Sequence, residues 1–248
     1  MFNHTCSPAS TTGSSPSRKP RRPRHRQPDA DLSSDLQLRV SRVLHGVSAE
    51  GPGLRTAIWV QGCSIRCNGC INPHLFNTRG GNSVDPEKIV LDALEAGVEG
   101  LTILGGEPFD QAAACASLAR SARRLGLGVI CFTGYTRESL EQDGDAAELI
   151  AAVDLLIDGP YIADLPEDRR ALVGSTNQRF INLTSRYADY DPADTPNRVE
   201  IRIGEDGTVA MAGFLIEDDL VAFSTSLDAR RTFRSPRSAT PQPSERDG

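Results

Sequence analysis

The stretch Leu101-Thr102-Ile103-Leu104-Gly105-Gly106-Glu107-Pro108 decides the fold class of this 248-residue chain. Its first four residues form a short apolar run, typical of a buried strand, and the glycines and the proline end that strand. A helix is predicted before it, with Asp85 as N-cap, Pro86 in the first turn and Gly97 just past the end. A second helix is predicted from Phe109 to Leu125. A strand between two helices indicates β–α–β units.

The same alternation continues on both sides of this stretch. Further strands are predicted at Leu38–Val43, Thr56–Val60, Leu127–Phe132 and Leu155–Ile157, a helix at Ala146–Ala152, and a terminal hairpin of Val199–Ile203 with Thr208–Met211. Repeated units of this kind predict an α/β fold with a mainly parallel sheet covered by helices. Polar or glycine-rich motifs follow three of the strands, and parallel α/β folds place ligands at that end of the sheet.

Composition divides the chain into a folded body and two tails. Residues 1–35 are rich in Ser, Pro, Thr and Arg, and 224–248 have a similar composition, so both are predicted to be disordered. The core domain is then expected at 36–223. No apolar run is long enough to cross a bilayer, and no signal peptide is recognisable. The chain is therefore expected to be cytoplasmic, where cysteines serve as thiols or metal ligands more often than as disulfides.

Charge is unevenly spread along the sequence. The net charge is −6, yet residues 1–35 sum to about +3 because Arg18 to Arg26 carries six positive charges. The remainder is acidic, which is not the pattern of a dedicated nucleic-acid-binding domain. The basic tail is either a solvated extension or a segment that touches RNA, DNA or an acidic protein.

The second decisive stretch is Gly62-Cys63-Ser64-Ile65-Arg66-Cys67-Asn68-Gly69-Cys70, with the spacing Cys-x3-Cys-x2-Cys. Three thiolates this close can bind one iron–sulfur cluster. A [4Fe–4S] cluster normally takes four thiolates, so three leave one iron open to a small molecule with an amino and a carboxylate group. Two other interpretations stay open on spacing alone: a structural zinc site completed by His74, or unligated core cysteines.

The turn Gly105-Gly106-Glu107 is a candidate ligand site. Adjacent glycines allow backbone to come close to a ligand, and a carboxylate could hold an ammonium group. Alone, the motif could equally be an ordinary turn. Its position one β–α unit after the cysteine loop strengthens the ligand interpretation.

Together these motifs resemble the radical SAM superfamily, and within it the activating enzymes of anaerobic ribonucleoside-triphosphate reductase. The resemblance covers about residues 37–215, excludes both tails, and adds several short motifs in family order. These motifs are Gly51-Pro52-Gly53-Leu54-Arg55, Gln61-Gly62-Cys63, Cys70-Ile71-Asn72-Pro73-His74, Thr133-Gly134-Tyr135, Asp158-Gly159-Pro160-Tyr161 and Gly174-Ser175-Thr176-Asn177-Gln178-Arg179.

The resemblance implies a role for each matching position. Cys63, Cys67 and Cys70 would bind one [4Fe–4S] cluster. Gly69, Cys70 and Ile71 would pass beside the adenine of S-adenosylmethionine (SAM), while Gly105, Gly106 and Glu107 would meet its methionine part. Many radical SAM proteins have an aromatic residue where this chain has Gly69. Five further positions are candidates whose alternative is turn and core hydrogen bonding: Thr133, Asp158, Asn177, Gln178 and Arg179. His74 is expected to structure the loop rather than ligate the cluster.

The resemblance also implies the chemistry and the partners. One electron from a flavodoxin- or ferredoxin-type donor would split SAM into methionine and a 5′-deoxyadenosyl radical, which would take a hydrogen atom from a glycine of the large reductase. A body of this size is too short for a complete eight-unit barrel, so a partial barrel is expected, with an open side for a protein partner. The alternatives are a radical SAM enzyme acting on another protein, peptide or small molecule, and a non-catalytic zinc- or cluster-binding interaction module.

Overall fold

The computed structural model describes residues 36–141, 144–214 and 225. The expected tails at 1–35 and 224–248, apart from Thr225, lie outside these described residues, as does 215–223 at the end of the expected core. The strands are β1 Leu38–Val47, β2 Arg55–Val60, β3 Asn82–Val84, β4 Gly100–Gly105, β5 Gly128–Phe132, β6 Leu155–Asp158, β7 Arg179–Asn182, β8 Val199–Ile203 and β9 Val209–Gly213. The α-helices are α1 Pro86–Glu95, α2 Ala112–Arg124, α3 Arg137–Leu140 and α4 Gly144–Ala152.

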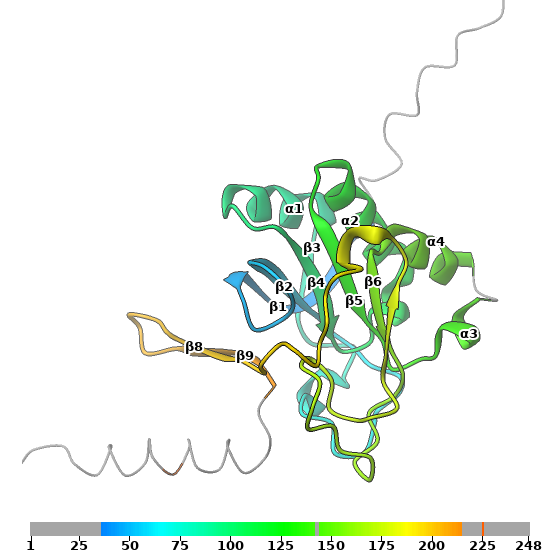
Figure 1. The fold of residues 1–248 in the computed structure, drawn as a ribbon. Helices are drawn as coiled ribbons and strands as arrows, with labels where there is room; N and C mark the ends of the chain where they lie inside the picture. Colours follow the sequence, from blue (N-terminus) through cyan, green and yellow to red (C-terminus); the bar gives the residue numbers. More distant parts are fainter. Residues whose placement is uncertain (1–35, 142–143, 215–224, 226–248) are drawn as a thin grey trace, which may run out of the picture. The chain divides into compact units, whose positions relative to one another are not determined.

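Seven strands form one mixed sheet in the order β3-β1-β2-β4-β5-β6-β7 (Figure 1). Its centre, β2-β4-β5-β6, is parallel, as predicted. The flanking strands β1, β3 and β7 pair in antiparallel fashion. Strands β3 and β7 were not predicted. Neither the polar Asn82-Ser83-Val84 nor Arg179-Phe180-Ile181-Asn182 shows an alternating pattern, and both are strands because they pair with β1 and β6.

The central strands bury side chains on both faces. On one face, Ile58, Ile103 and Cys131 belong to a cluster that also includes α1, α2 and α4, and these helices cover that face in Figure 1. On the other face, Ile130 and Ile157 pack against a cluster that includes residues 171–173, 180, 187 and 190. Strands covered on both faces read as continuous apolar runs, which is why the sequence revealed them.

Helix α1 starts as predicted. The Asp85 side chain accepts a hydrogen bond from the backbone N–H of Glu87, and Gly97 follows the helix with φ of 65°. The second helix is shorter than predicted, because Pro108–Gln111 forms a 3-10 turn and α2 begins only at Ala112. The Gln111 side chain holds that turn, donating to the carbonyl of Gln61 (3.0 Å) and bonding Arg39 on β1.

The amino ends of the parallel strands meet at a fully buried arginine. Arg55 Nε donates to Thr102 Oγ1 (2.6 Å), and its terminal nitrogens donate to the carbonyls of Leu101 and Gly128 and to the Tyr187 hydroxyl. A fifth bond goes to the carbonyl of Pro52. The guanidinium has five donors in a fixed fork, and here all three of its nitrogens are bonded. This end of the sheet is therefore closed by a satisfied polar network.

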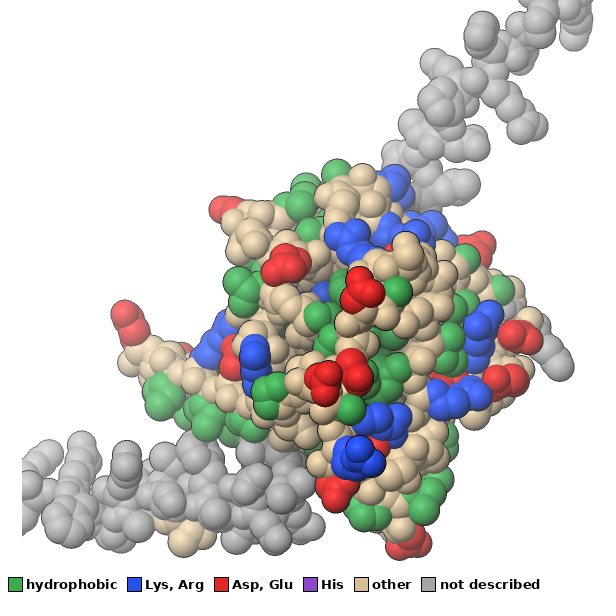
Figure 2. Space-filling view, viewed as in Figure 1, with side chains coloured by type: hydrophobic (Ala, Val, Ile, Leu, Met, Phe, Trp, Pro, Cys, Tyr) green, Lys and Arg blue, Asp and Glu red, His purple; other side chains and the backbone are tan. Residues whose placement is uncertain are grey.

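Strands β8 and β9 form a separate antiparallel hairpin. Glu200 accepts bonds from Ser48 Oγ (2.7 Å) and Ala49 N (3.1 Å), and Arg202 donates to the carbonyl of Gly46 (2.8 Å). Side chains on the opposite side of the hairpin stay exposed, and Figure 2 shows a run of apolar side chains along it. They include Val199, Ile201, Ile203 and Val209. Among the described residues, no helix is long and apolar enough to span a bilayer.

Candidate functional site

The cysteine loop begins where β2 ends and folds back on its own base. Gly62 N donates to the carbonyl of Leu75 (2.9 Å), and the Gln61 side chain donates to the carbonyl of Asn77 (2.6 Å). Gly62 adopts φ of 98°, a conformation that favours glycine. These contacts close the loop into a compact unit at the carboxyl end of the sheet.

The start of the loop is also tied to its neighbours on the sheet. The backbone N–H and hydroxyl of Ser64 both bond the Asp110 carboxylate (2.7 Å each). The same hydroxyl lies 2.8 Å from the Tyr135 hydroxyl. Asp110 follows β4 and Tyr135 follows β5, so two turns at the carboxyl ends of adjacent parallel strands hold the loop in place.

Cys63, Cys67 and Cys70 line one cavity of about 600 Å³. All three are partly buried, and burial raises the pKa of the Cys63 and Cys70 thiols. Among the described residues, no three His, Cys, Asp or Glu side chains are close enough to share one metal ion. A zinc ion needs its ligands at one centre, whereas a cluster binds each thiolate at a different iron. Three thiols from one short loop that line a single cavity suit a cluster with one open iron.

Gly105 and Gly106 line the same cavity, and the structure shows a further reason for both glycines. A Cβ on Gly105 would lie 2.6 Å from the Cα of Trp59, and one on Gly106 would lie 2.0 Å from the carbonyl oxygen of Gly62. Gly106 N also donates to the carbonyl of Val60 (2.9 Å). The pair of glycines therefore lets this turn pack directly against the base of the cysteine loop, besides presenting backbone to the cavity.

Glu107 is almost completely buried and receives three hydrogen bonds. Its carboxylate accepts from Phe109 N, Thr133 Oγ1 and Gly134 N, each at 2.9 Å. Burial raises the pKa of Glu107 to about 7, while these hydrogen bonds oppose the shift. Thr133, a candidate from the sequence, is thus a direct partner of Glu107. A carboxylate in this position is oriented from three sides and lines the cavity.

Asp158 and Arg179 form a pair beside the cavity rather than in its lining. The Asp158 carboxylate is buried, accepts from Arg137 N (2.7 Å), and is bonded through both oxygens by the Arg179 guanidinium. Asp158 and Glu138 together raise the pKa of Arg179 above its ordinary range. This pair joins the end of β6 to the start of β7, which favours the structural interpretation of both residues.

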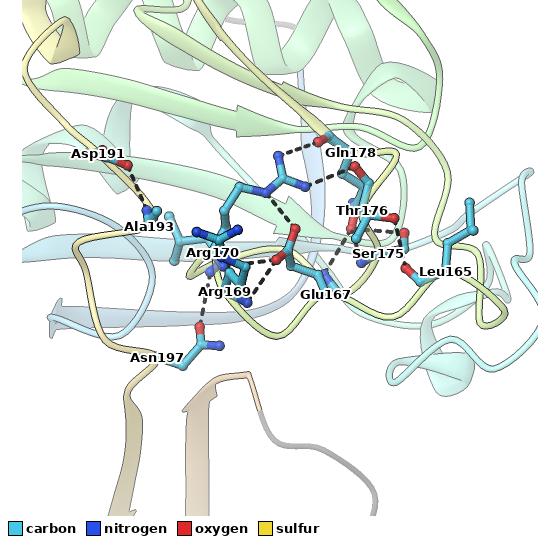
Figure 3. A network of polar contacts seen from close by, with 12 residues as sticks. Leu165, Glu167, Arg169, Arg170, Ser175, Thr176, Gln178, Asp191, Ala193 and Asn197 are labelled. Atoms are coloured by element: carbon cyan, nitrogen blue, oxygen red, sulfur yellow. Dashed lines mark hydrogen bonds and ion pairs between the residues drawn. The ribbon is translucent and has the colours of Figure 1, made fainter.

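Asn177 and Gln178 lie in a loop that Arg170 holds together (Figure 3). Arg170 bonds the Glu167 carboxylate (2.6 Å) and the carbonyls of Gln178 and Thr176. Gln178 reaches the cavity, while Asn177 donates to the carbonyl of Pro160 (2.8 Å). The Oδ1 of Asn177 is buried and has no hydrogen-bond partner among the described residues.

Arg42 and Glu50 also line the cavity, and neither was predicted from the sequence. Arg42 stacks on the Trp59 ring at 3.8 Å, and Glu50 accepts a bond from Gly213 N (2.6 Å) at the end of the hairpin. Burial raises the pKa of Glu50 to about 7 and lowers that of Arg42. Glu50 could have been found from the sequence, because it directly precedes the Gly-Pro-Gly motif. No motif in the sequence around Arg42 points to a role in the cavity.

Tyr161 closes the cavity next to the third cysteine. A Cβ on Gly69 would lie 3.3 Å from Tyr161 Cε1, and Gly69 has φ of 76°. The ring therefore lies beside the position where many radical SAM proteins have an aromatic residue in the loop itself. The sequence quoted Tyr161 only as part of a motif and assigned it no role.

Comparisons with known proteins identify the family of the chain. Residues 49–181 match the family described as 4Fe-4S single cluster domain. The anaerobic ribonucleoside-triphosphate reductase-activating protein of Enterobacteria phage T4 is 30% identical over 151 residues, spanning 57% of this chain and 92% of its own. The pyruvate formate-lyase 1-activating enzyme of Escherichia coli K12 is 29% identical over 150 residues, spanning 57% of this chain and 59% of its own.

The crystal structure of QueE from Escherichia coli superposes on 42% of this chain and 55% of its own, with 16% identity and a TM-score of 0.34, too partial to bear on function. The sequence relatives confirm the family and the enzyme class predicted from the motifs. The chain belongs to the 4Fe-4S single cluster domain family, in the branch of radical SAM enzymes that activate glycyl radical enzymes.

Proposed function

We propose that this chain installs a glycyl radical on an anaerobic ribonucleoside-triphosphate reductase. The observation that carries the proposal is the shared cavity: three cysteines from one loop and Gly105-Gly106-Glu107 from the next turn line the same 600 Å³ space. A cluster site and a site for an amino acid group are adjacent there. The relative from phage T4 bears the name of such an activating protein.

In this proposal, different residues bind the cluster and SAM. Cys63, Cys67 and Cys70 hold a single [4Fe–4S] cluster, and Glu107 receives the ammonium group of SAM. The backbone at Gly105, Gly106 and 69–71 borders its methionine and adenine parts. When bound, cluster and SAM supply a one-electron reductive cleavage that yields a 5′-deoxyadenosyl radical. The buried hydrogen bonds to Glu107 fix its carboxylate before SAM arrives, which reduces the ordering needed on binding.

The candidates Asp158, Asn177, Gln178 and Arg179 have different roles in this proposal. Gln178 lines the cavity and is the member of the group that meets SAM or substrate. Asp158 and Arg179 position the loop by joining β6 and β7. Asn177 orders the backbone at Pro160.

The open sheet explains how a protein substrate reaches the cavity. The sheet has two open edges, at the antiparallel strands β3 and β7, and we propose that it forms a partial barrel. We propose that this partial barrel leaves one side open and that the reductase covers it, placing its glycine next to SAM. In the cytoplasm, a flavodoxin- or ferredoxin-type protein supplies the electron.

The proposal is tested with anaerobically reconstituted protein. We expect about four irons per chain, cleavage of SAM after reduction, and a glycyl radical signal by electron paramagnetic resonance once the reductase is added. SAM cleavage without any radical on the reductase would contradict the assignment of the partner. A preparation that binds one zinc and no iron would contradict the cluster itself.

A second candidate function is the activation of another glycyl radical enzyme. The similarity to the activating enzyme of pyruvate formate-lyase 1 favours it, since the identity is nearly the same as to the reductase-activating protein. Mixing the reduced, SAM-loaded protein with each of the two large enzymes in turn distinguishes the candidates. The true partner is the one that acquires the glycyl radical signal.

A further inference from the structure

The cysteine loop differs in charge from the acidic body of the chain that follows the basic residues 1–35. Between residues 61 and 84 there is no Asp or Glu, while Arg66 and Arg79 are both present. Both arginines are exposed. A third cation joins them, because Arg39 donates to the carbonyl of Gly80 (3.2 Å). The segment that presents the cluster ligands is therefore positively charged in a chain whose net charge is −6.

These charges are not neutralised within the described part of the chain. Most of its arginines bond a carboxylate, a carbonyl or another group, or stack on a ring. Four described arginine side chains have no such contact: Arg66, Arg79, Arg169 and Arg198. One carboxylate touches the cysteine loop, that of Asp110 at Ser64, and Ser64 already bonds both of its oxygens. The two loop arginines are thus free to interact with an external partner.

The loop has two sides with different neighbours. Its cysteines line the cavity, whereas Arg66, Asn68 and Arg79 do not. Arg66 lies between two of the cysteines, in a left-handed conformation with φ of 56°. Its guanidinium is therefore on the solvent side of the residues that would hold the cluster. An electron can enter from this side while the cavity side stays occupied by SAM and substrate.

We infer that Arg66 and Arg79 form the docking surface for an acidic one-electron carrier protein. This inference rests on the proposed function. In the docked complex one electron leaves the reduced carrier and enters the cluster, so the carrier is oxidised by one electron. Complexes between electron-transfer proteins have small interfaces. Complementary charge increases the rate of such encounters by about 10 to 10³, so two unpaired arginines beside the cluster can have a large effect.

The test compares two double variants of the full-length, cluster-loaded protein that lose the same charge. Arg66→Gln with Arg79→Gln removes the proposed surface, and Arg169→Gln with Arg198→Gln is the matched control. The readouts are the Kd of an acidic flavodoxin and the rate at which reduced flavodoxin bleaches the cluster. Iron content verifies that each variant folds and binds its cluster. If the double loop variant loses iron, the single variant Arg79→Gln replaces it in the comparison, because Arg79 lies outside the segment that contains the three cysteines.

We expect the loop variant to raise the Kd about tenfold at low ionic strength and the control about twofold or less. The difference should shrink at high salt, because exposed charges are screened. Equal weakening in both variants, or none in either, would overturn the inference.

The reductase is the other protein that could use these arginines. A small uncharged photoreductant bypasses the carrier, so with it the loop variant should produce as much glycyl radical as the wild type. Loss of that radical with an unchanged flavodoxin Kd would assign the arginines to the reductase and overturn the inference. Failure of the wild type to cleave SAM with the photoreductant would refute the proposed function instead, while the Kd comparison would still decide the docking surface.

Discussion

The two ends of the parallel strands each contain a buried ionisable side chain, but the surroundings of these two side chains differ. At the amino end, Arg55 is buried and every guanidinium nitrogen is bonded within the protein. At the carboxyl end, Glu107 is almost as deeply buried but lines a cavity. A satisfied buried charge stabilises the fold, whereas a buried charge beside empty space is available to a ligand. We therefore expect substitution of Arg55 to affect mainly stability and substitution of cavity residues to affect mainly function.

The largest effect on function is expected when one cysteine at the carboxyl end is removed. Cys67→Ala should abolish cluster binding and all SAM cleavage, because two thiolates cannot hold the cluster. The free energy of unfolding of the iron-free protein should change little, since Cys67 is only partly buried. Iron analysis and SAM cleavage assays check this. Cys115→Ala, a buried cysteine in α2, is the control and should keep its iron; retained activity in Cys67→Ala would refute the site.

The amino end should respond in the reverse manner. Arg55→Met leaves the carbonyls of Leu101 and Gly128 and the hydroxyl of Thr102 without their donor, so we expect a loss of about 3 kcal/mol or more in unfolding free energy. Below its lowered melting temperature the variant should still bind iron. Denaturant titration and iron analysis measure both effects. Arg120→Met removes an exposed pair with Glu148 and should cost about 1 kcal/mol or less; an equal loss in both variants would contradict the distinction.

The raised pKa of Glu107 predicts that the stability of the protein depends on pH. Burial raises its pKa from the ordinary 4.5 to about 7, so the folded state retains a proton that the unfolded chain releases. The resulting stabilisation is complete below about pH 4.5 and is lost as the pH rises through 7. It amounts to about 3 kcal/mol at most.

Glu107→Gln should therefore show a smaller fall in stability between pH 4.5 and 8 than the wild type, measured by denaturant titration of the iron-free protein. Glu50, with a similarly raised pKa, remains in both proteins and cancels in the difference. The exposed Glu95→Gln is the control and should follow the wild-type profile. Parallel profiles for Glu107→Gln and the wild type would show that the pKa of this carboxyl is the same in the folded and unfolded states.

The smallest effect is expected from a residue outside the cavity. Asp85 caps α1 by accepting a bond from Glu87 N (2.9 Å), so Asp85→Ala should lower the unfolding free energy by about 1 kcal/mol. Iron content and SAM cleavage should stay at wild-type levels, and Asp85→Asn should recover most of the stability. Thermal unfolding and iron analysis are sufficient. A loss of iron in Asp85→Ala would show that the cluster site depends on the helix as a whole.

The strands and helices of the core could be predicted because their patterns are local. Apolar runs such as Leu101–Leu104 mark strands buried on both faces, and Asp85 with Pro86 marks a helix start. Strands β3 and β7 could not be predicted, since a polar segment becomes a strand only through its neighbour. The late start of α2 relative to the predicted second helix has the same cause, because Gln111 bonds Arg39 on β1 and Gln61 just after β2.

The cysteine spacing alone left a cluster and a zinc site open, and the order of the short motifs along the chain then indicated a cluster with one open iron. Which other residues surround the cysteines and the glycine turn became apparent from the folded chain. The tertiary structure placed Arg42, Glu50 and Tyr161 around the cavity, made Thr133 a partner of Glu107, and assigned Asp158 and Arg179 to each other. The cysteine spacing is visible in the sequence because it lies within one short loop. The cavity lining is not, because its residues come from strands and loops that meet only after folding.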